Sequence, residues 1–443
     1  MSTRNASLIR SAIVVLVAVF VVFAFSVPAR AESQARIVRL SDVHGDVEMD
    51  KNSGAGYEKA FLNLPVTQGA LLRTLNDGRA EVEFEDGSAL RLTPNTTVEF
   101  KTLALADGKH ISELNLTNGK AYLNWLGKSG DALTLNFSRE KVTLLHSAHF
   151  RVETSTALVE VAVFKGDVEV VSPGGSLDLG KKKTATFDPA NADKGALAKD
   201  FAQDAYDDWD KQASAYHDTY ARNNSTPYGY GYSDLSYYGS FSNVAGYGSL
   251  WQPYFTGVGW DPFMDGAWSS YPGFGFLWVS AYPWGWMPYN YGNWIFVPGA
   301  GWMWQPGGWN GWNGTPRFVG TPPQRGFRAP TPPTTPGKTV VVGGGGRVLT
   351  GTPLHGTTLI TRGSAGLNVP RGSLGNLGHL NREVSKAGSI ALRSTPPAYS
   401  AVGISRIAGP GRGGNERPAM SSAPSVHSAP AAASHSSGGG RPH

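Results

Sequence analysis

Few side chains in this sequence have the types and spacing that chemistry requires. Glu81, Glu83 and Glu85 alternate along one short segment, and His146 and His149 lie close together. Paired carboxylates can act as general acid and base, whereas zinc needs three or four converging ligands. Alternate positions of a strand share one face, so the glutamates are more simply explained as a solvent-exposed face. We therefore assign no catalytic residue, no metal ligand and no cofactor to these groups.

Established catalytic motifs are absent from the sequence. It contains no G-x-S-x-G, H-E-x-x-H or P-loop motif, and no cysteine that could act as a nucleophile, form a disulfide or carry a lipid anchor. The sequence therefore predicts a protein that is not an enzyme. A hydrolase of the cell wall is the alternative from the enzyme class.

Aromatic side chains form the larger group of candidate binding residues. Eleven of the thirteen tryptophans lie between Trp251 and Trp312. The form W-x-P-[FY]-x-x-G-x-W occurs at residues 260–268 and again at 286–294, an offset of 26 residues. The register continues through further prolines, glycines and tryptophans, which indicates two copies of one unit over residues 260–311.

These rings allow two interpretations. Glycine lets rings and backbones approach closely, so the rings could form the core of a small β module. Alternatively, exposed flat rings could stack on the sugars of a cell-wall glycan. The candidate aromatic binding surface then consists of Trp260, Phe263, Trp268, Trp278, Trp286, Tyr289, Trp294 and Trp304. Nucleic acid is not expected as a partner, because this segment lacks the Lys and Arg that bind phosphate.

The elements that would position these groups begin with a β-hairpin. Ala80, Val82 and Phe84 alternate with charged residues, Asp86-Gly87 marks a turn, and a second alternating strand follows. We expect this hairpin to have one wet face. Short strands with turn signals about every ten residues continue to residue 189, which predicts an all-β domain.

The hairpin and its surroundings resemble the FecR domain. That family has a G-x-x-L-x-T entry, a D-G-S between two strands and a P-N-T-type turn, matched here by Gly69, Leu72, Thr74, Asp86, Gly87, Ser88, Pro94, Asn95 and Thr96. The usual opening Trp is replaced by Tyr57 or Phe61. The resemblance covers about residues 37–175 and implies a β-solenoid-like or jelly-roll-like module in the envelope compartment. The family's relay to a cytoplasmic anti-sigma segment is not carried over, because only about ten residues precede the hydrophobic run.

Composition divides the chain into five expected parts. Residues 1–31 are a signal peptide with an A-x-A site before residue 32, or an inner-membrane anchor if residues 10–27 stay uncleaved. Residues 32–189 are the FecR-like all-β domain, 190–224 a helical connector, and 225–313 the Trp/Tyr/Gly-rich repeat module, which resembles repeats that often follow FecR domains. Residues 314–443 are a disordered basic tail with 14 Lys and Arg against 2 Asp and Glu.

The connector is expected to be one helix of about 28 residues. A stripe of residues recurs every three or four positions and consists of Leu197, Phe201, Ala205, Trp209, Ala213, Tyr216 and Tyr220. We expect this stripe to dock on a neighbouring domain and the acidic residues between its members to face water. An acidic patch that binds calcium or a partner is the alternative, although the segment lacks the glycine and spaced oxygens of a dedicated calcium loop.

The sequence thus predicts a non-catalytic exported protein, periplasmic or at the cell surface. Its expected partner is an envelope protein or a cell-wall glycan, and its basic tail is expected to contact anionic envelope surfaces. The alternative function is a periplasmic sensor component of a signalling system, acting with a separate membrane or sigma-regulator partner.

Overall fold

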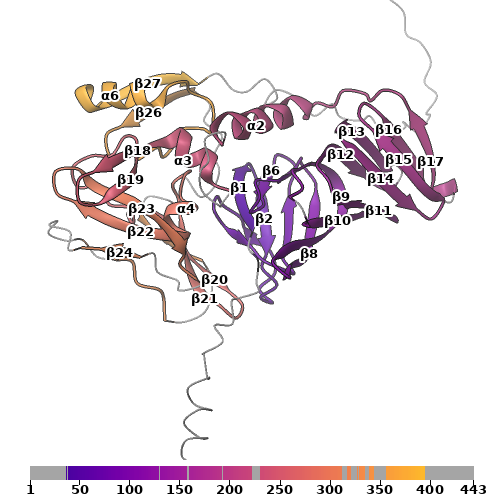
Figure 1. Ribbon diagram of the computed structural model, residues 1–443, viewed down its shortest axis with the longest axis horizontal. Helices are drawn as coiled ribbons and strands as arrows, with labels where there is room; N and C mark the ends of the chain where they lie inside the picture. Colours follow the sequence, from indigo (N-terminus) through magenta and orange to yellow (C-terminus); the bar gives the residue numbers. More distant parts are fainter. Residues whose placement is uncertain are drawn as a thin grey trace, which may run out of the picture. The chain divides into compact units, whose positions relative to one another are not determined.

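The computed structural model describes residues 36, 38–128, 130–156, 159–191, 193–221, 230–311, 317–320, 327, 329–334, 339–343 and 356–394 (Figure 1). The chain divides into two compact units, residues 1–400 and 401–443, and all described residues belong to the first. The expected signal peptide lies outside the described residues. Within the described ranges, no helix is both long enough and apolar enough to cross a bilayer.

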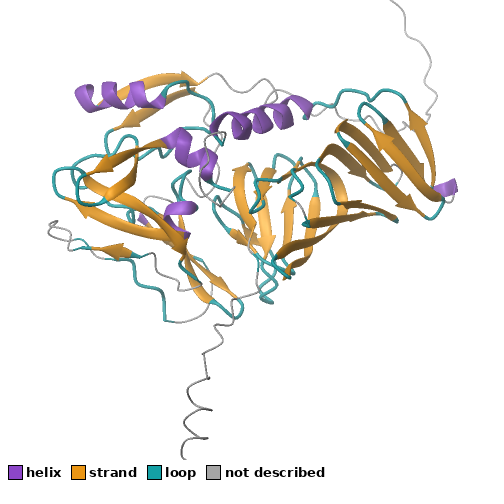
Figure 2. Ribbon diagram, viewed as in Figure 1, coloured by secondary structure: helices purple, strands orange, loops and turns teal. Residues whose placement is uncertain are grey.

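The N-terminal half is built from seventeen strands, which confirms the predicted all-β fold class (Figure 2). The strands are β1 Val38–His44, β2 Val47–Asp50, β3 Glu58–Lys59, β4 Pro65–Val66, β5 Leu71–Thr74, β6 Arg79–Glu83, β7 Ala89–Leu92, β8 Thr97–Ala106, β9 Lys109–Trp125, β10 Ala132–Phe137, β11 Glu140–Leu144, β12 Ala148–Thr154, β13 Val159–Lys165, β14 Asp167–Ser172, β15 Gly175–Gly180, β16 Thr184–Asp188 and β17 Lys194–Ala198. A short 3-10 turn, η1 Pro189–Asn191, separates the last two.

One long strand, β9, joins two sets of paired strands. Its first half pairs with β8 and β10, and its second half pairs with β7 and β12. The predicted hairpin is formed by β6 and β7, with Val82 opposite Leu90. Alternate side chains point to opposite faces of a strand. The apolar set, which includes Val82, Leu90, Leu123 and Phe150, is therefore buried together in one hydrophobic core.

The expected 28-residue helix is wrong in its first half. Residues 194–198 form strand β17, which pairs with β16, and the helix α2 spans only Asp207–Tyr220. A Cβ atom at Gly195 would lie 2.9 Å from the ring of Phe187, so the absence of a side chain lets the strand pack on that ring. The apolar residues from Leu197 onwards therefore lie first at the end of strand β17 and then on helix α2, although their spacing resembled that of one helix.

The aromatic module contains three successive β-hairpins. A short helix, α3 Tyr232–Tyr238, precedes β18 Gly239–Val244 and β19 Gly248–Pro253; β20 Gly266–Tyr271 and β21 Gly275–Ser280 follow; α4 Met287–Asn290 precedes β22 Tyr291–Val297 and β23 Gly301–Trp309. Trp268 lies opposite Trp278, and Trp294 lies opposite Trp304. These two pairs occupy equivalent places in the two sequence repeats, so each copy of the repeat is one hairpin.

The first of the three hairpins is a third copy that the sequence analysis missed. Phe241 lies opposite Trp251, as Trp268 lies opposite Trp278. The turns also agree: Gly246 and Gly248 have φ of +81°, close to the +75° and +79° of their counterparts Gly273 and Gly275. Only the glycines and one tryptophan of the repeat are kept here. An alignment restricted to the G-x-G turn and the following Trp would have found it.

The expectation of a disordered tail is wrong for residues 356–394. These residues form a hairpin, β26 Gly356–Thr361 and β27 Ser389–Ser394, with the helix α6 Leu377–Ala387 between its strands. Two shorter strands precede it, β24 Phe318–Val319 and β25 Val340–Val342. Apolar side chains at Ile360, Val384 and Leu377 join the aromatic core, which provides the burial that composition alone did not indicate. The last 49 residues lie outside the described part of the chain.

Candidate functional site

The eight aromatic residues of the proposed binding surface are buried. Their exposed fractions range from 0% to 5%, for Trp260, Phe263, Trp268, Trp278, Trp286, Tyr289, Trp294 and Trp304. They pack on one another mostly edge to face; the rings of Trp268 and Trp278, for example, have centroids 5.3 Å apart. These rings therefore form the core of the module, and their faces are not available to stack on a sugar.

The rings also form a row across the sheet. Five aromatic residues lie in register on five neighbouring strands, in the order β18-β19-β23-β22-β24. They are Phe241, Trp251, Trp304, Trp294 and Phe318. The three tryptophans at the centre of the row are at most 1% exposed, whereas Phe241 at its end is 38% exposed. The centre of the row is thus buried, whereas Phe318 at its β24 end is half-buried and Phe241 at its β18 end is exposed.

A second row, of polar residues, crosses the FecR-like sheet on the face opposite its core. Asp42, Glu81, Arg91, Tyr122 and Arg151 are neighbours in register on β1, β6, β7, β9 and β12. We call these five residues the polar row. The expectation that this face of the hairpin is wet is wrong, because Glu81 is 1% exposed and Arg91 is fully buried. The chain covers this face with its own later segments.

Helix α2 covers much of the polar row, and its residues Asp207 and Asp210 face the sheet, whereas Asp208 is exposed to water as expected. Asp210 accepts a hydrogen bond of 2.6 Å from Arg91. Asp207 accepts one of 2.7 Å from Arg151 and one of 2.8 Å from Tyr122. The aspartates recur every third residue, which places them on one side of the helix, opposite basic partners. The spacing of these aspartates was visible in the sequence, but the basic residues of the sheet that they contact could not be inferred from it.

Glu81 is the most heavily contacted carboxylate of the polar row. It accepts hydrogen bonds from Ser41, Arg91 and Arg371 at 2.7, 2.8 and 2.7 Å, and its Oε1 lies 3.0 Å from Nε2 of His217. Burial alone would raise the pKa of Glu81. The charges of His217, Arg91 and Arg371 outweigh that effect and hold the pKa well below its usual value.

Glu81 belongs to a set of mostly buried charges that joins five segments of the chain: β1, β6, α2, α3 and the segment that carries Arg371. We call it the junction cluster and define it as Arg39, Glu81, Glu83, His217, Asp234 and Arg371. Arg39 pairs with Asp234 of α3, and Arg371 donates two hydrogen bonds of 3.1 Å to the same carboxylate. Burial would raise the pKa of Asp234, but Arg371 and Arg39 lower it below its usual value.

Glu83 is the less compensated carboxylate of the junction cluster. It accepts a hydrogen bond of 3.1 Å from the backbone N–H of Gly231 and lies 3.4 Å from Arg39. Burial raises the pKa of Glu83 above its usual value, because His217 and Arg39 offset only part of the desolvation and Asp234 adds repulsion. Glu81 and Glu83, two residues apart on β6, thus have pKa values shifted in opposite directions.

The two histidines considered as metal ligands do not converge. His146 is exposed. His149 is half-buried, and its Nε2 lies 2.7 Å from the carboxylate of Asp210. Among the described residues, no group of three or more His, Cys, Asp or Glu side chains is arranged to hold a metal ion.

The junction cluster has acid and base groups, but its three carboxylates are almost fully buried. Glu81, Glu83 and Asp234 are each 1% exposed, and Arg39 is fully buried. Each of the three carboxylates is already bound by donors from this chain. The arrangement suits cohesion between segments more than proton transfer to a ligand, since a catalytic group must reach the reacting atom.

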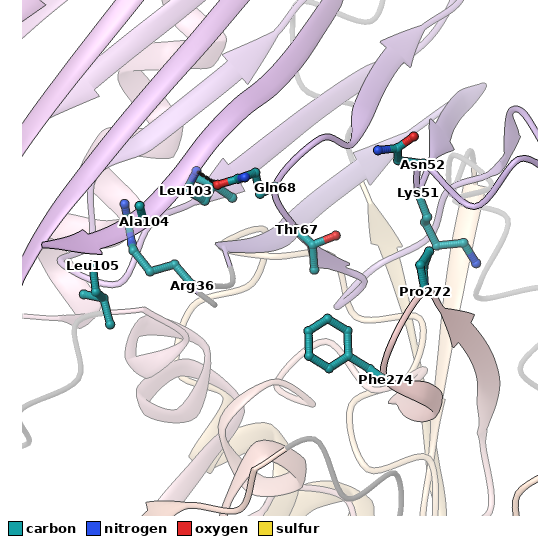
Figure 3. Close-up of a pocket in the computed structure, with 10 residues that line it drawn as sticks. All are labelled: Arg36, Lys51, Asn52, Thr67, Gln68, Leu103, Ala104, Leu105, Pro272 and Phe274. Carbon is teal, nitrogen blue, oxygen red and sulfur yellow. Dashed lines mark hydrogen bonds between the residues drawn. The ribbon is translucent and has the colours of Figure 1, made fainter. Parts of the chain in front are cut away.

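An open pocket of about 410 Å³ lies elsewhere, where residues of the FecR-like strands approach the turn of the second hairpin (Figure 3). In Figure 3 the ring of Phe274 points towards Thr67. The charged residues that line the pocket have partners within the chain: Arg36 pairs with Glu85 at 2.8 Å, and Lys51 pairs with Glu58 at 2.8 Å. No member of the junction cluster lines it.

Comparison with known protein families identifies both modules. Residues 70–169 match the family described as FecR protein, which confirms the resemblance carried by the hairpin. Residues 232–326 match a family of unknown function, DUF6600, and these bounds include all three hairpins. No curated protein matches the chain.

Two solved structures are similar to part of the chain. Both are titled "Crystal structure of a putative anti-sigma factor from Parabacteroides distasonis", and both are 21% identical to this chain with a TM-score of 0.27. The matches cover 30% and 31% of this chain, and 61% and 63% of those chains. The similarity thus spans less than two thirds of their length.

Proposed function

We propose that this chain is a non-catalytic binding and scaffold protein of the cell envelope, in which the FecR domain and the hairpin module act together on a protein partner. The junction cluster carries the proposal. It joins β1 and β6 of the FecR domain to α2, α3 and the Arg371 segment through buried ion pairs, so the modules are fastened by charge as well as by apolar packing. Charged groups that are buried to join the modules favour a protein that binds a partner over an enzyme that turns over a substrate.

A protein partner is favoured over a glycan. The tryptophans that a sugar platform would require are in the core, whereas the match to the FecR family favours a role that is carried out through another protein. Export, by cleavage after Ala31, is part of the proposal and places the partner outside the cytoplasm.

The test uses the purified full-length chain as an immobilised bait. Detergent-solubilised envelope proteins and isolated wall glycan are offered separately at physiological salt. We expect a single envelope protein to be retained in fixed stoichiometry and the glycan to pass through. Retention of glycan without protein, or retention of neither, would contradict the proposal.

The second candidate function is a periplasmic sensor component that acts with a separate membrane or sigma-regulator partner, and the FecR match favours it. Deletion of the gene should then change transcription of a regulator's target genes. An unchanged transcriptome would exclude this role and leave the scaffold function in place.

A further inference from the structure

The second and third hairpins each receive an additional strand on the outer edge of their first strand. On β20 the additional strand is β25, with Val340 opposite Trp268. On β22 it is β24, with Phe318 opposite Trp294, and the backbone N–H of Trp294 donates a hydrogen bond of 2.9 Å to the carbonyl of Arg317 (Figure 1). Both added strands come from the chain that follows the repeats.

The first hairpin has no such strand among the described residues. β18 occupies the same place as β20 and β22, pairs with β19 over six residues, and ends the order of its sheet. Ser240, Phe241, Ser242 and Asn243 are exposed. An edge strand leaves N–H and C=O groups unpaired along one side, so this edge offers hydrogen bonds to another strand.

The edge of β18 lacks the features by which proteins usually prevent such pairing. Lysine, proline, bulges and inward charges normally block exposed edges. The strand reads Gly-Ser-Phe-Ser-Asn-Val, with no charge and no proline, and its pairing with β19 runs without a bulge. An unprotected edge of this length is expected where a second strand binds.

The side chains indicate what that strand must carry. Each added strand places an apolar residue, Val340 or Phe318, opposite the aromatic residue of its hairpin. The equivalent residue of β18 is Phe241, which is 38% exposed and whose ring centroid lies 6.5 Å from that of Trp304. A strand with a large apolar residue opposite Phe241 would bury this ring and extend the aromatic row to a sixth position.

We propose that the outer edge of β18 binds an extended segment of a partner protein by strand addition. The segment is uncharged over roughly four residues and carries a large apolar side chain opposite Phe241. Main-chain hydrogen bonds supply the affinity, and the contact of that side chain with the ring of Phe241 supplies the specificity. This inference rests on the proposed function, because it names the site at which the protein partner binds.

The decisive experiment places a photo-crosslinking amino acid at position 243 of the full-length chain, in cells that normally produce it. Asn243 is exposed and on the same face of β18 as Phe241. The cross-linked peptide is then sequenced by mass spectrometry. We expect it to be one segment of another protein, with the uncharged apolar character given above.

Other cross-linked products would overturn the proposal. A peptide from β18 of a second copy would make the edge a self-association surface. A peptide from residues 395–443 would assign the edge to the chain's own C-terminal segment. Scattered products, or none, would show that the edge binds no specific strand.

Variants separate this site from the proposed function as a whole. Phe241→Lys and Ser242→Lys each put a charge on the edge and should weaken retention of the partner roughly tenfold or more. Val258→Lys is the matched control, since Val258 is fully exposed in a loop, and it should retain the partner normally. Undiminished binding by both edge variants would overturn the site but not the binding function. Absence of binding by the unaltered chain would overturn the function itself.

Discussion

At the scale of single residues, the charged side chains on the covered face of the FecR-like sheet depend on partners from distant parts of the chain. Glu81 and Arg91 have the alternation expected of a wet strand face, yet both are buried. A buried charge costs free energy unless it is paired and hydrogen-bonded, and Glu81 meets that condition through Ser41, Arg91 and Arg371. The local sequence contains only one of these partners at short range, which is why the burial could not be read from the hairpin itself.

Replacing Glu81 by glutamine should destabilise the fold in a pH-dependent manner. The variant removes one of the two carboxylates that Arg91 and Arg371 each contact, which leaves Arg91 with Asp210 and Arg371 with Asp234. Loss of this buried ion pairing should cost about 3 kcal/mol at neutral pH. Because the pKa of Glu81 is lowered in the fold, its stabilisation is complete above the unfolded value of about 4.3 and is lost as pH falls through the folded pKa. The difference in unfolding free energy between the two proteins should therefore shrink below about pH 4.3.

Denaturant unfolding at a series of pH values measures this difference. Glu83, whose pKa is raised, titrates in both proteins and so cancels to first order. Glu169→Gln is the matched control, since Glu169 is exposed on β14, and it should change stability by less than about 0.5 kcal/mol at every pH. A Glu81→Gln protein whose deficit stays constant from neutral to acid pH would contradict the assignment of the stabilisation to this carboxylate.

At the scale of elements, the hairpins were the most predictable part of the fold. The β6–β7 hairpin and the two W-x-P-[FY]-x-x-G-x-W units follow from alternation, turn residues and repetition, and all three form. Two elements were missed for opposite reasons. The first hairpin, β18–β19, keeps too little of the repeat, and residues 356–394 have a tail-like composition but gain a core from rings far away in the sequence.

The burial of the candidate aromatic residues was less predictable than the hairpins that carry them. The sequence identified the aromatic residues as a group, but spacing within one hairpin does not say whether another element covers its rings. Trp294 has neighbours from residue 260 to residue 318, and burial of this kind depends on how the hairpins pack. The edge of β18 shows the same limit, since it is recognised only by comparison with the two hairpins whose edges are filled.

Substituting Gly266 by alanine should destabilise the second hairpin by steric overlap. A Cβ atom there would lie 2.4 Å from the ring of Trp278, and the backbone of Gly266 is outside the left-handed region, so sterics alone account for the cost. We expect a loss of about 1–3 kcal/mol in the free energy of unfolding, measured by tryptophan fluorescence in denaturant. Gly308→Ala is the control, because no atom lies within 4 Å of its added Cβ. Equal stability of the two variants would argue against the close approach of ring and backbone.

At the scale of the whole chain, the segment at residues 356–394 stabilises a hairpin almost three hundred residues earlier. Arg371 reaches Glu81 at 2.7 Å and Asp234 at 3.1 Å. Three further hydrogen bonds hold the segment on the aromatic module: Tyr238 donates to the carbonyl of Val369, Tyr237 to that of Leu374, and Trp284 to that of Ala365. Part of the positive charge that neutralises the carboxylates of the junction cluster is thus supplied by Arg371, from a part of the chain that lies beyond both matched families.

Truncation should reveal this long-range dependence. A chain that ends at His355 lacks Arg371, so the carboxylates of Glu81 and Asp234 lose a buried cation and become solvated. We expect the amides of β6 to exchange hydrogen roughly tenfold faster or more, because the local opening free energy falls by about 1.4 kcal/mol or more. Hydrogen exchange followed by mass spectrometry of peptides that cover β6 measures the effect.

Two companion proteins assign the effect to the ion pairs. A chain that ends at Ser394 keeps Arg371 and should exchange at the rate of the full-length protein. Arg371→Met, in an otherwise complete chain, removes the charge but keeps the aliphatic contact, and it should reproduce most of the acceleration in β6 while leaving β14 unchanged. If β6 exchanges at the same rate in all of these proteins, the polar row is stabilised by α2 and α3 alone. The segment at residues 356–394 then contributes nothing to the stability of β6.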